Sequence, residues 1–306
     1  MGNKEIHEIS ANVKLTIGMP VYNDIDFIEG SLNSILELQD RDFILLISDD
    51  NSNDGSGEIC KRFAEKDKRV VYIKQSVNLG ISKNMKLLLD MAQSPYFMWA
   101  GDDDLWHPRF TTELIRLLEE NKAAVSSFCI YQEIDDHGEN YFPYLTIGNY
   151  HNPDKVQRLK YFIKNALDGF GYGIFRTDLI KEVEFPVWWW PNKKSPLNNI
   201  YPTLCYYLAQ GDFVYYEKEV LYWKRKKTRA KTNYTSTGEG KSIKALIAYF
   251  IRKFNLIVCS FQSVKKSSGL SVATKLILPL CTEWFMKPCL QQVVILVKAI
   301  LRRLKK

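Results

Sequence analysis

Three consecutive aspartates, Asp102, Asp103 and Asp104, follow the apolar segment Tyr96–Trp99, and their type and spacing suggest chemistry. Adjacent carboxylates repel one another, and hard divalent cations such as Mg²⁺ or Mn²⁺ take oxygen ligands of this kind. We therefore interpret the run as a strand end that carries a metal site. The alternative is a solvated acidic turn before a helix that begins near Pro108, because Asp is favoured before a helix and Pro in its first turn.

Short apolar runs alternate with helix-like segments through the first half of the chain. The strand-like runs are Lys14–Met19, Phe43–Ser48, Val70–Ile73, Tyr96–Trp99 and Ala124–Ile130, and the helical stretches between them are Ile25–Leu38, Ser56–Lys66, Ser82–Ala92 and Arg109–Asn121. This βαβα order predicts an α/β fold with a mainly parallel sheet covered by helices on both faces. Ligands of such folds bind at the carboxyl ends of the strands.

Polar clusters follow four of the expected strands. They are Pro20-Val21-Tyr22-Asn23, the run from Asp49 to Ser56, Asn78-Leu79-Gly80 and the acidic run itself. All four are expected to meet at one edge of the sheet. No GxGxxG or GxxxxGK[ST] motif follows a strand, which disfavours a dinucleotide enzyme or a P-loop ATPase.

Composition and charge limit the classes of protein that the chain can represent. Its 306 residues are 46% hydrophobic and 25% charged, enough for a sizeable core. The six cysteines are scattered without a CxxC pair and no apolar signal peptide precedes them, which favours a reducing compartment and no zinc site.

The net charge of +7 is unevenly distributed. From Trp223 to Lys306 the chain carries 19 of its 42 Lys/Arg residues against Glu239 and Glu283, which leaves 23 Lys/Arg against 33 Asp/Glu in residues 1–222. A basic tail mixed with apolar residues suits an anionic membrane surface better than a nucleic acid, which is not expected as a partner.

With these motifs in view, residues 14 to about 225 resemble an inverting family 2 glycosyltransferase of the GT-A fold. The polar clusters are similar to the PxYN, DDxSxDGS, NxG and DxD-type segments of that family, in the usual order and spacing. The stretches Asn78–Asn84 and Gly173–Asp178 resemble those of members that build bacterial surface polysaccharides. The resemblance implies a GT-A domain over residues 1–225, with a nucleotide-sugar half at about 14–131 and an acceptor half at about 132–225.

The resemblance also implies roles for particular residues. Tyr22 matches the position that stacks on the nucleotide base, and Asp50 the position that accepts from the base imide, as a uracil or thymine ring needs. The alternatives are a core aromatic for Tyr22 and a turn-forming residue for Asp50. The other matching nucleotide-sugar positions are Pro20, Asn23, Asp49, Asn78, Gly80, Asn84 and Asp102.

The acidic run departs from the pattern of the family. Aligned on the following Leu-Trp-x-Pro, the family's first Asp falls on Gly101 and its metal-ligand position on Asp103. We expect Asp103, assisted by Asp104, to hold Mn²⁺ or Mg²⁺, which would neutralise the charge on the departing nucleoside diphosphate.

An inverting transfer needs a general base, which the family usually places in the second half of the domain. The stretch from Phe185 to Gln210 contains no carboxylate, and Asn198 and Asn199 lie close to where the base is expected. Asp168, just before Gly169–Gly173, is the nearest upstream substitute, and a turn-forming Asp before Gly is the alternative.

The second half also carries an aromatic cluster. Trp188, Trp189 and Trp190 with Tyr201, Tyr206 and Tyr207 would form an acceptor platform or pack the helix expected over Pro196–Ala209 onto the sheet. We expect packing for most of them and one indole at the acceptor.

The tail begins with a basic connector over residues 226–240. Apolar residues then recur at helical spacing in Ile243–Phe261 and Leu290–Leu304, within a basic amphipathic region at 241–306. Charged residues interrupt each apolar stretch, so we expect these helices to lie on the cytoplasmic face of a membrane as a peripheral attachment. The alternative is a helical subdomain packed on the rest of the chain or on another copy.

The sequence thus predicts a metal-dependent inverting glycosyltransferase that uses a UDP- or dTDP-sugar and a lipid-linked or surface polysaccharide acceptor. A nucleotidyltransferase would want a basic Gly-rich loop near the N-terminus, which the sequence does not show. The rival from another class is a non-catalytic nucleotide-sugar-binding subunit of a glycan assembly complex. Whether the chain forms a homo-oligomer is left open.

Overall fold

Four parallel strands form the first half of the sheet. In the computed structural model, which describes residues 3–144, 150–165, 169–186, 200–226 and 243–294, β1 (Leu15–Val21) lies between β2 (Phe43–Asp49) and β4 (Tyr96–Trp99). β3 (Val70–Lys74) pairs with the other side of β2. Every residue of β2 and β4 is buried, because these strands are covered on both faces, as continuous apolar runs predict.

The second half of the sheet mixes directions. β8 (Ile174–Arg176) runs antiparallel to β4 and β6 (Ala124–Ile134), while β9 (Asp212–Arg225) runs parallel to β6 and pairs with the short β5 (Leu105–Trp106). Within the described residues the order is β3-β2-β1-β4-β8-β6-β9-β5, with β7 (Asn140–Tyr144) beside β6. The predicted α/β class with a mixed central sheet is confirmed.

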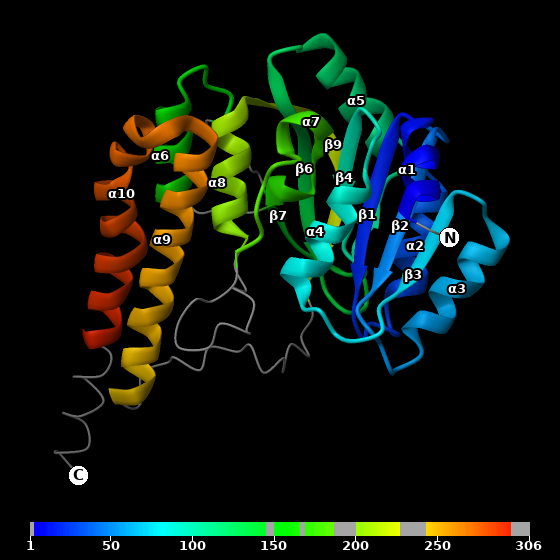
Figure 1. Ribbon diagram of the computed structural model, residues 1–306, viewed down its shortest axis with the longest axis horizontal. Coiled ribbons are helices and arrows are strands. Elements are labelled where there is room, and N and C mark those ends of the chain that lie inside the picture. Colours follow the sequence, from blue (N-terminus) through cyan, green and yellow to red (C-terminus); the bar gives the residue numbers. More distant parts are fainter. Residues whose placement is uncertain (1–2, 145–149, 166–168, 187–199, 227–242, 295–306) are drawn as a thin grey trace.

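The helices of the first half occupy the stretches that the periodicity predicted. They are α2 (Ile28–Leu36), α3 (Ser56–Lys66), α4 (Ile81–Met91) and α5 (Phe110–Glu120), preceded by α1 (Asn3–Ala11). The second half adds α6 (Lys155–Asn165), a 3₁₀ turn (Gly169–Tyr172), α7 (Thr177–Ile180) and α8 (Tyr201–Gln210). Helices α6 and α8 lie at the side of the sheet that faces the C-terminal helices (Figure 1).

The C-terminal helices pack on this side of the molecule. α9 (Ile243–Thr274) contains a break at Gly269, where φ is 80°, and α10 (Ile277–Cys281) continues through a π-helical turn (Thr282–Met286) into a helix that is described to residue 294. Leu256 and Val264 of α9 belong to the same buried core as the sheet. Trp284 contacts α6, where its Nε1 donates to the Ile163 carbonyl at 2.6 Å.

This packing corresponds to the alternative of a helical subdomain seated on the rest of the chain. The helix expected over Ile243–Phe261 is longer than predicted and extends to Thr274. Most of the expected connector, and the part of the expected helix Leu290–Leu304 that follows residue 294, lie outside the described residues. Among the helices that the structure describes, none combines the length and the apolar content needed to cross a membrane.

Candidate functional site

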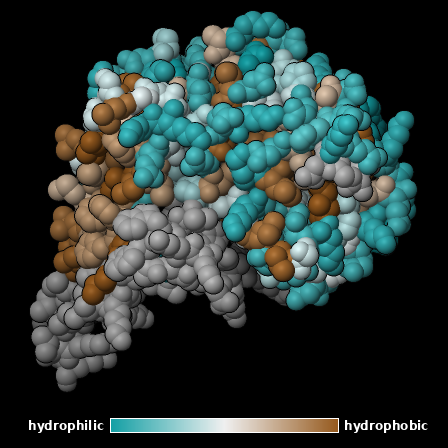
Figure 2. Space-filling model, in the orientation of Figure 1, coloured by the Kyte–Doolittle hydropathy of each residue, from teal (hydrophilic) through white to brown (hydrophobic). Residues whose placement is uncertain are grey.

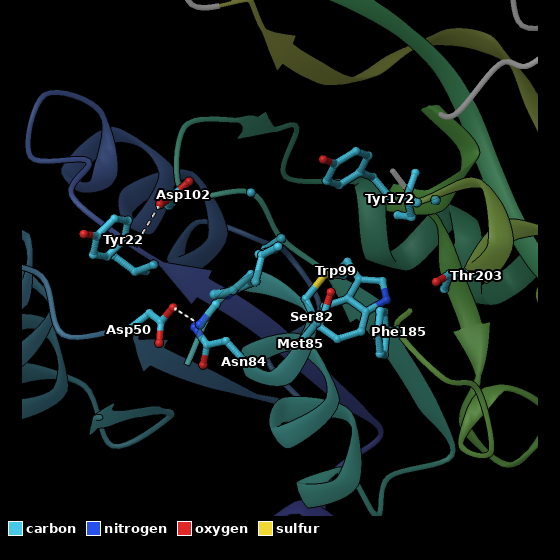
Figure 3. Close-up of a pocket in the computed structure, with 18 of the residues that line it drawn as sticks. Tyr22, Asp50, Ser82, Asn84, Met85, Trp99, Asp102, Tyr172, Phe185 and Thr203 are labelled. Atoms are coloured by element: carbon cyan, nitrogen blue, oxygen red, sulfur yellow. Dashed lines mark hydrogen bonds between the residues drawn. The ribbon is translucent and has the colours of Figure 1, made fainter. Parts of the chain in front are cut away.

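A cavity of about 590 Å³ opens at the carboxyl ends of β1 and β4. Its two ends differ in chemistry (Figure 3): Tyr22, Asp50 and Asp102 lie at one end, and Trp99, Phe185 and Tyr172 lie at the other. Of the residues expected to bind a nucleotide-sugar, the cavity is lined by Pro20, Tyr22, Asp50, Asn78, Gly80, Asn84 and Asp102, together with the expected metal ligand Asp103.

The loop after β1 is held by the loop after β2. Asn23 has a φ of 52°, its backbone N donates to Ser52 Oγ at 3.0 Å, and its Oδ1 accepts from the Asn53 backbone N at 2.9 Å. Asn23 therefore joins the two loops and is not among the residues that line the cavity, so its part in nucleotide binding stays a prediction. Tyr22, next to it, is 51% exposed, so the alternative of a core aromatic is wrong.

The two aspartates after β2 have different surroundings. Asp49 is fully buried, accepting from the Ser52 backbone N at 2.8 Å and from the Tyr72 hydroxyl at 2.7 Å. It does not line the cavity, so the expectation that it binds the nucleotide is replaced by a structural role in the turn. Asp50 lines the cavity and accepts from the backbone N atoms of Leu79 at 2.6 Å and Gly80 at 2.9 Å, which fixes the loop before α4.

Asn84, on α4, has a free acceptor at the polar end of the cavity. Its Nδ2 donates to the Ser48 carbonyl at 2.8 Å, and its side chain is 1% exposed. Its Oδ1 has no hydrogen-bond partner among the described residues. A buried carbonyl oxygen without a donor is costly, so a ligand hydroxyl or N–H at this position would be favoured.

Asp102 and Asp103 form a carboxylate cluster with a third residue, Asp24. One carboxylate oxygen of each lies within 4.8 Å of the others. Asp102 Oδ2 also accepts from the Tyr22 backbone N at 3.4 Å, which places the cluster beside the expected base-binding residue. Sequence reasoning missed Asp24, although it directly follows the PxYN segment at the sheet edge where the ligands were expected.

Asp104, expected as a second metal ligand, is buried and is not part of this cluster. Its Oδ2 accepts from the Tyr222 hydroxyl at 2.6 Å and its Oδ1 from the Arg225 backbone N at 2.8 Å, both on β9. Burial raises the pKa of this carboxyl, and the nearby Asp103 charge acts in the same direction. The structure thus assigns Asp104 to fastening the acidic run to β9, a correction of its expected role.

The glycine that replaces the family's first Asp has a steric explanation. A Cβ at Gly101 would lie 2.5 Å from Asp104 Oδ2 and 3.2 Å from Asp103 Oδ1. A larger residue at position 101 would press on Asp104, which β9 holds in place, and on Asp103, which lines the cavity.

The other end of the cavity is aromatic. Trp99 Nε1 donates to the Tyr207 hydroxyl at 3.3 Å, and the Trp99 ring meets Phe185 edge-on at 5.7 Å. Tyr206 and Tyr207 are buried, as packing predicts, whereas Tyr201 lines the cavity. The carboxylates among its described lining residues are Asp50, Asp102 and Asp103, all at the polar end. The predicted base Asp168, the tryptophans Trp188–Trp190, Asn198 and Asn199 lie outside the described residues.

Comparison with known proteins agrees with this site. Residues 16–184, more than half of the chain, match the family described as "Glycosyl transferase family 2", and the chain belongs to this family. It is 29% identical over 190 residues to the dTDP-rhamnosyl transferase RfbG of Shigella flexneri, covering 60% of this chain and 61% of RfbG. It is 22% identical over 203 residues to the GalNAc(5)-diNAcBac-PP-undecaprenol beta-1,3-glucosyltransferase of Campylobacter jejuni, covering 66% and 64%.

A solved structure shows the same fold. TarS 1-349 of S. aureus in complex with UDP superposes with a TM-score of 0.58 at 15% identity, covering 87% of this chain and 69% of that one. The predicted GT-A fold is thereby confirmed. The chain covers between 26% and 61% of the full length of three of its curated relatives, which is less than two thirds in each case.

Proposed function

We propose that the chain is a metal-dependent inverting glycosyltransferase that moves a sugar from a UDP- or dTDP-sugar to a lipid-linked or surface polysaccharide acceptor. The observation that carries the proposal is the cavity at the strand ends, where an exposed aromatic ring, a fixed carboxylate and an acidic cluster lie together. The family supplies the reaction class.

The polar end suits a pyrimidine nucleotide. The exposed Tyr22 ring offers a face on which a base can stack, and Asp50 retains acceptor capacity because each carboxylate oxygen can accept more than one hydrogen bond. Asn84 Oδ1 adds a buried acceptor for a ribose hydroxyl or an imide N–H. The Shigella relative, named a dTDP-rhamnosyl transferase, supports the same type of donor.

The acidic cluster fits Mn²⁺ or Mg²⁺. Three carboxylate oxygens within 4.8 Å of one another are the hard ligands that these ions take, so Asp24, Asp102 and Asp103 would hold the ion. When bound, it would supply positive charge to the diphosphate leaving group. Asp104 and Arg225 keep the backbone of this run in place: the Arg225 guanidinium Nε donates to the Asp103 carbonyl at 3.0 Å.

The aromatic end suits the sugar and its acceptor. Trp99, Phe185 and Tyr201 offer flat apolar faces of the kind on which sugar rings pack, with Thr203 as a polar group beside them. For the proton of the attacking hydroxyl we propose Asp168 as the base. The Campylobacter relative, whose name includes an undecaprenol-linked glycan, supports a lipid-linked acceptor.

A second candidate function is a non-catalytic nucleotide-sugar-binding subunit. The lack of a carboxylate among the described lining residues of the aromatic end favours it. Titrating the protein with UDP-, dTDP- and GDP-sugars in Mn²⁺ tests binding, and we expect a pyrimidine donor to bind about tenfold or more tightly than GDP-sugar. Release of nucleoside diphosphate only when a lipid-linked glycan is added would establish transfer. Binding without release for any acceptor would favour the subunit, and no binding would contradict both.

A further inference from the structure

The C-terminal helices expose a set of large apolar side chains on their outer side. We define the apolar ridge as Ile247, Phe254, Leu278, Met286, Leu290 and Val294, which are between 43% and 74% exposed. Met286, Leu290 and Val294 recur every four residues, so they share one face of the helix that follows α10. Figure 2 shows hydrophobic side chains gathered over α9 and α10, while much of the visible α/β part is hydrophilic.

The two helices that carry the apolar ridge are neighbours. The Phe250 ring on α9 lies 6.0 Å from the Phe285 ring, so the part of α9 between Ile247 and Phe254 is beside the start of the segment that carries Met286 and Leu290. Their inner sides are buried against the rest of the protein, with Leu256 and Trp284 each 5% exposed. The apolar ridge is therefore not the face that holds the helices to the catalytic part.

The charge around the apolar ridge favours an anionic surface as its binding partner. Residues 243–294, which carry the apolar ridge, contain seven Lys/Arg and one Glu. Arg252 is exposed on α9 and Lys275 in the turn between α9 and α10, while Lys287, exposed on the helix that follows α10, pairs with the single Glu283. Two copies of so basic a surface repel each other, whereas an anionic lipid surface neutralises it and takes up the apolar side chains.

The same helices support the cavity wall. Trp284 lies 5.2 Å from Tyr201, ring centre to ring centre, and Tyr201 lines the cavity. The C-terminal helix that carries Trp284 and helix α8, whose Tyr201 lines the cavity, therefore lie between the apolar ridge and the cavity.

We infer that the apolar ridge and its basic flanks dock the protein on an anionic lipid bilayer, holding the cavity close to acceptors that are anchored in that bilayer. The acceptor class rests on the proposed function, but the docking does not. Lys and Arg near an anionic leaflet contribute additively with apolar burial, so the attachment is expected to weaken with salt.

The test uses the full-length protein and sedimentation with vesicles. Wild-type protein should bind vesicles of equal parts phosphatidylglycerol and phosphatidylcholine, and pure phosphatidylcholine vesicles about tenfold less, with binding falling at high salt. Leu290→Glu, at a side chain that is 65% exposed, should lower the partition coefficient about tenfold or more. The matched control is Leu179→Glu on α7, an exposed leucine outside the apolar ridge, which should bind as wild type does.

Circular dichroism and nucleotide binding in solution distinguish a specific loss of vesicle binding from a loss of folding. Both glutamate variants should retain the wild-type spectrum and nucleotide affinity, because neither leucine lines the cavity. Wild-type protein that ignores anionic vesicles, or a Leu290→Glu variant that binds them equally well, would overturn the inference. A dimer that Leu290→Glu dissociates, without vesicle binding, would overturn it in favour of a second copy. Failure of the wild-type protein to bind nucleotide would count against the proposed function and would leave the inferred docking unaffected.

Discussion

Asp104 and Arg225 are joined by a hydrogen bond from the Arg225 backbone N to Asp104 Oδ1, at 2.8 Å, between residues 121 positions apart in the chain. The Arg225 side chain completes the connection, because its Nε donates to the Asp103 carbonyl and its guanidinium carbon lies 4.6 Å from the centre of the Phe27 ring. The end of β9 thus sets the position of the acidic run. Asp103 and Asp104, although adjacent in the chain, therefore have different roles, and substituting each of them should have a different effect.

Asp104→Ala should destabilise the fold. Removing this buried carboxylate leaves the Tyr222 hydroxyl and the Arg225 N–H without their acceptor, at about 1–3 kcal/mol for each unsatisfied group. Thermal unfolding should show a melting temperature several degrees lower than that of the wild type. Asp103→Ala, at a carboxylate that lines the cavity, is the control and should melt close to the wild type. Equal melting temperatures for all three proteins would show that Asp104 does not fasten the run.

Gly101→Asp should weaken nucleotide binding, although it restores the aspartate of the family pattern. Its Cβ would lie 2.5 Å from Asp104 Oδ2, so the carboxylates must shift. Gly30→Ala on α2, where an added Cβ meets Leu105 only at 3.9 Å, should be tolerated as the control. Calorimetry should compare the nucleotide affinities of both variants with that of the wild type. A Gly101→Asp variant that binds metal and nucleotide more tightly than the wild type would refute the steric account.

Tyr22→Ala should lower nucleotide affinity about tenfold or more, because stacking of a base on an aromatic ring contributes about 1–3 kcal/mol. The side chain is 51% exposed, so the melting temperature should change little. Tyr22→Phe keeps the ring and should bind like the wild type. If Tyr22→Ala keeps wild-type affinity, the base does not stack on this residue.

Asp168→Asn tests the proposed base. The amide cannot accept the proton of the acceptor hydroxyl at neutral pH, so turnover should fall about a hundredfold or more while donor affinity stays the same. Single-turnover transfer and donor titration on the same preparation give both quantities. Undiminished turnover would exclude Asp168 as the base.

The sequence predicted the parts of the fold that depend on local pattern. The strands β1 to β4 and the helices α2 to α5 appear where apolar runs and helical periodicity placed them, because strands buried on both faces are continuously apolar. β5 has two residues and β8 three, too few to give a periodic signal, and their place in the sheet depends on the distant β9 and β6.

The sequence predicted where the candidate site lies better than it predicted the role of each residue in it. The residues expected at the sheet edge do gather there, but whether an aspartate faces the cavity depends on partners far along the chain. Asp49 is held by Tyr72 and Asp104 by Tyr222, and no local motif contains these pairs. Asp24 joins the acidic cluster through the β1–α2 loop, across a separation that residue spacing alone does not reveal.

The central claim is that this cavity binds a nucleotide through a metal held by its acidic cluster, and calorimetric titration with UDP and dTDP tests it most directly. With Mn²⁺ present, the wild type should bind at least one of the two nucleotides, and EDTA should weaken that binding by about two orders of magnitude. In Asp103→Ala, binding should be weak and nearly the same with Mn²⁺ and with EDTA. Equal affinity of the wild type in Mn²⁺ and in EDTA would contradict the claim.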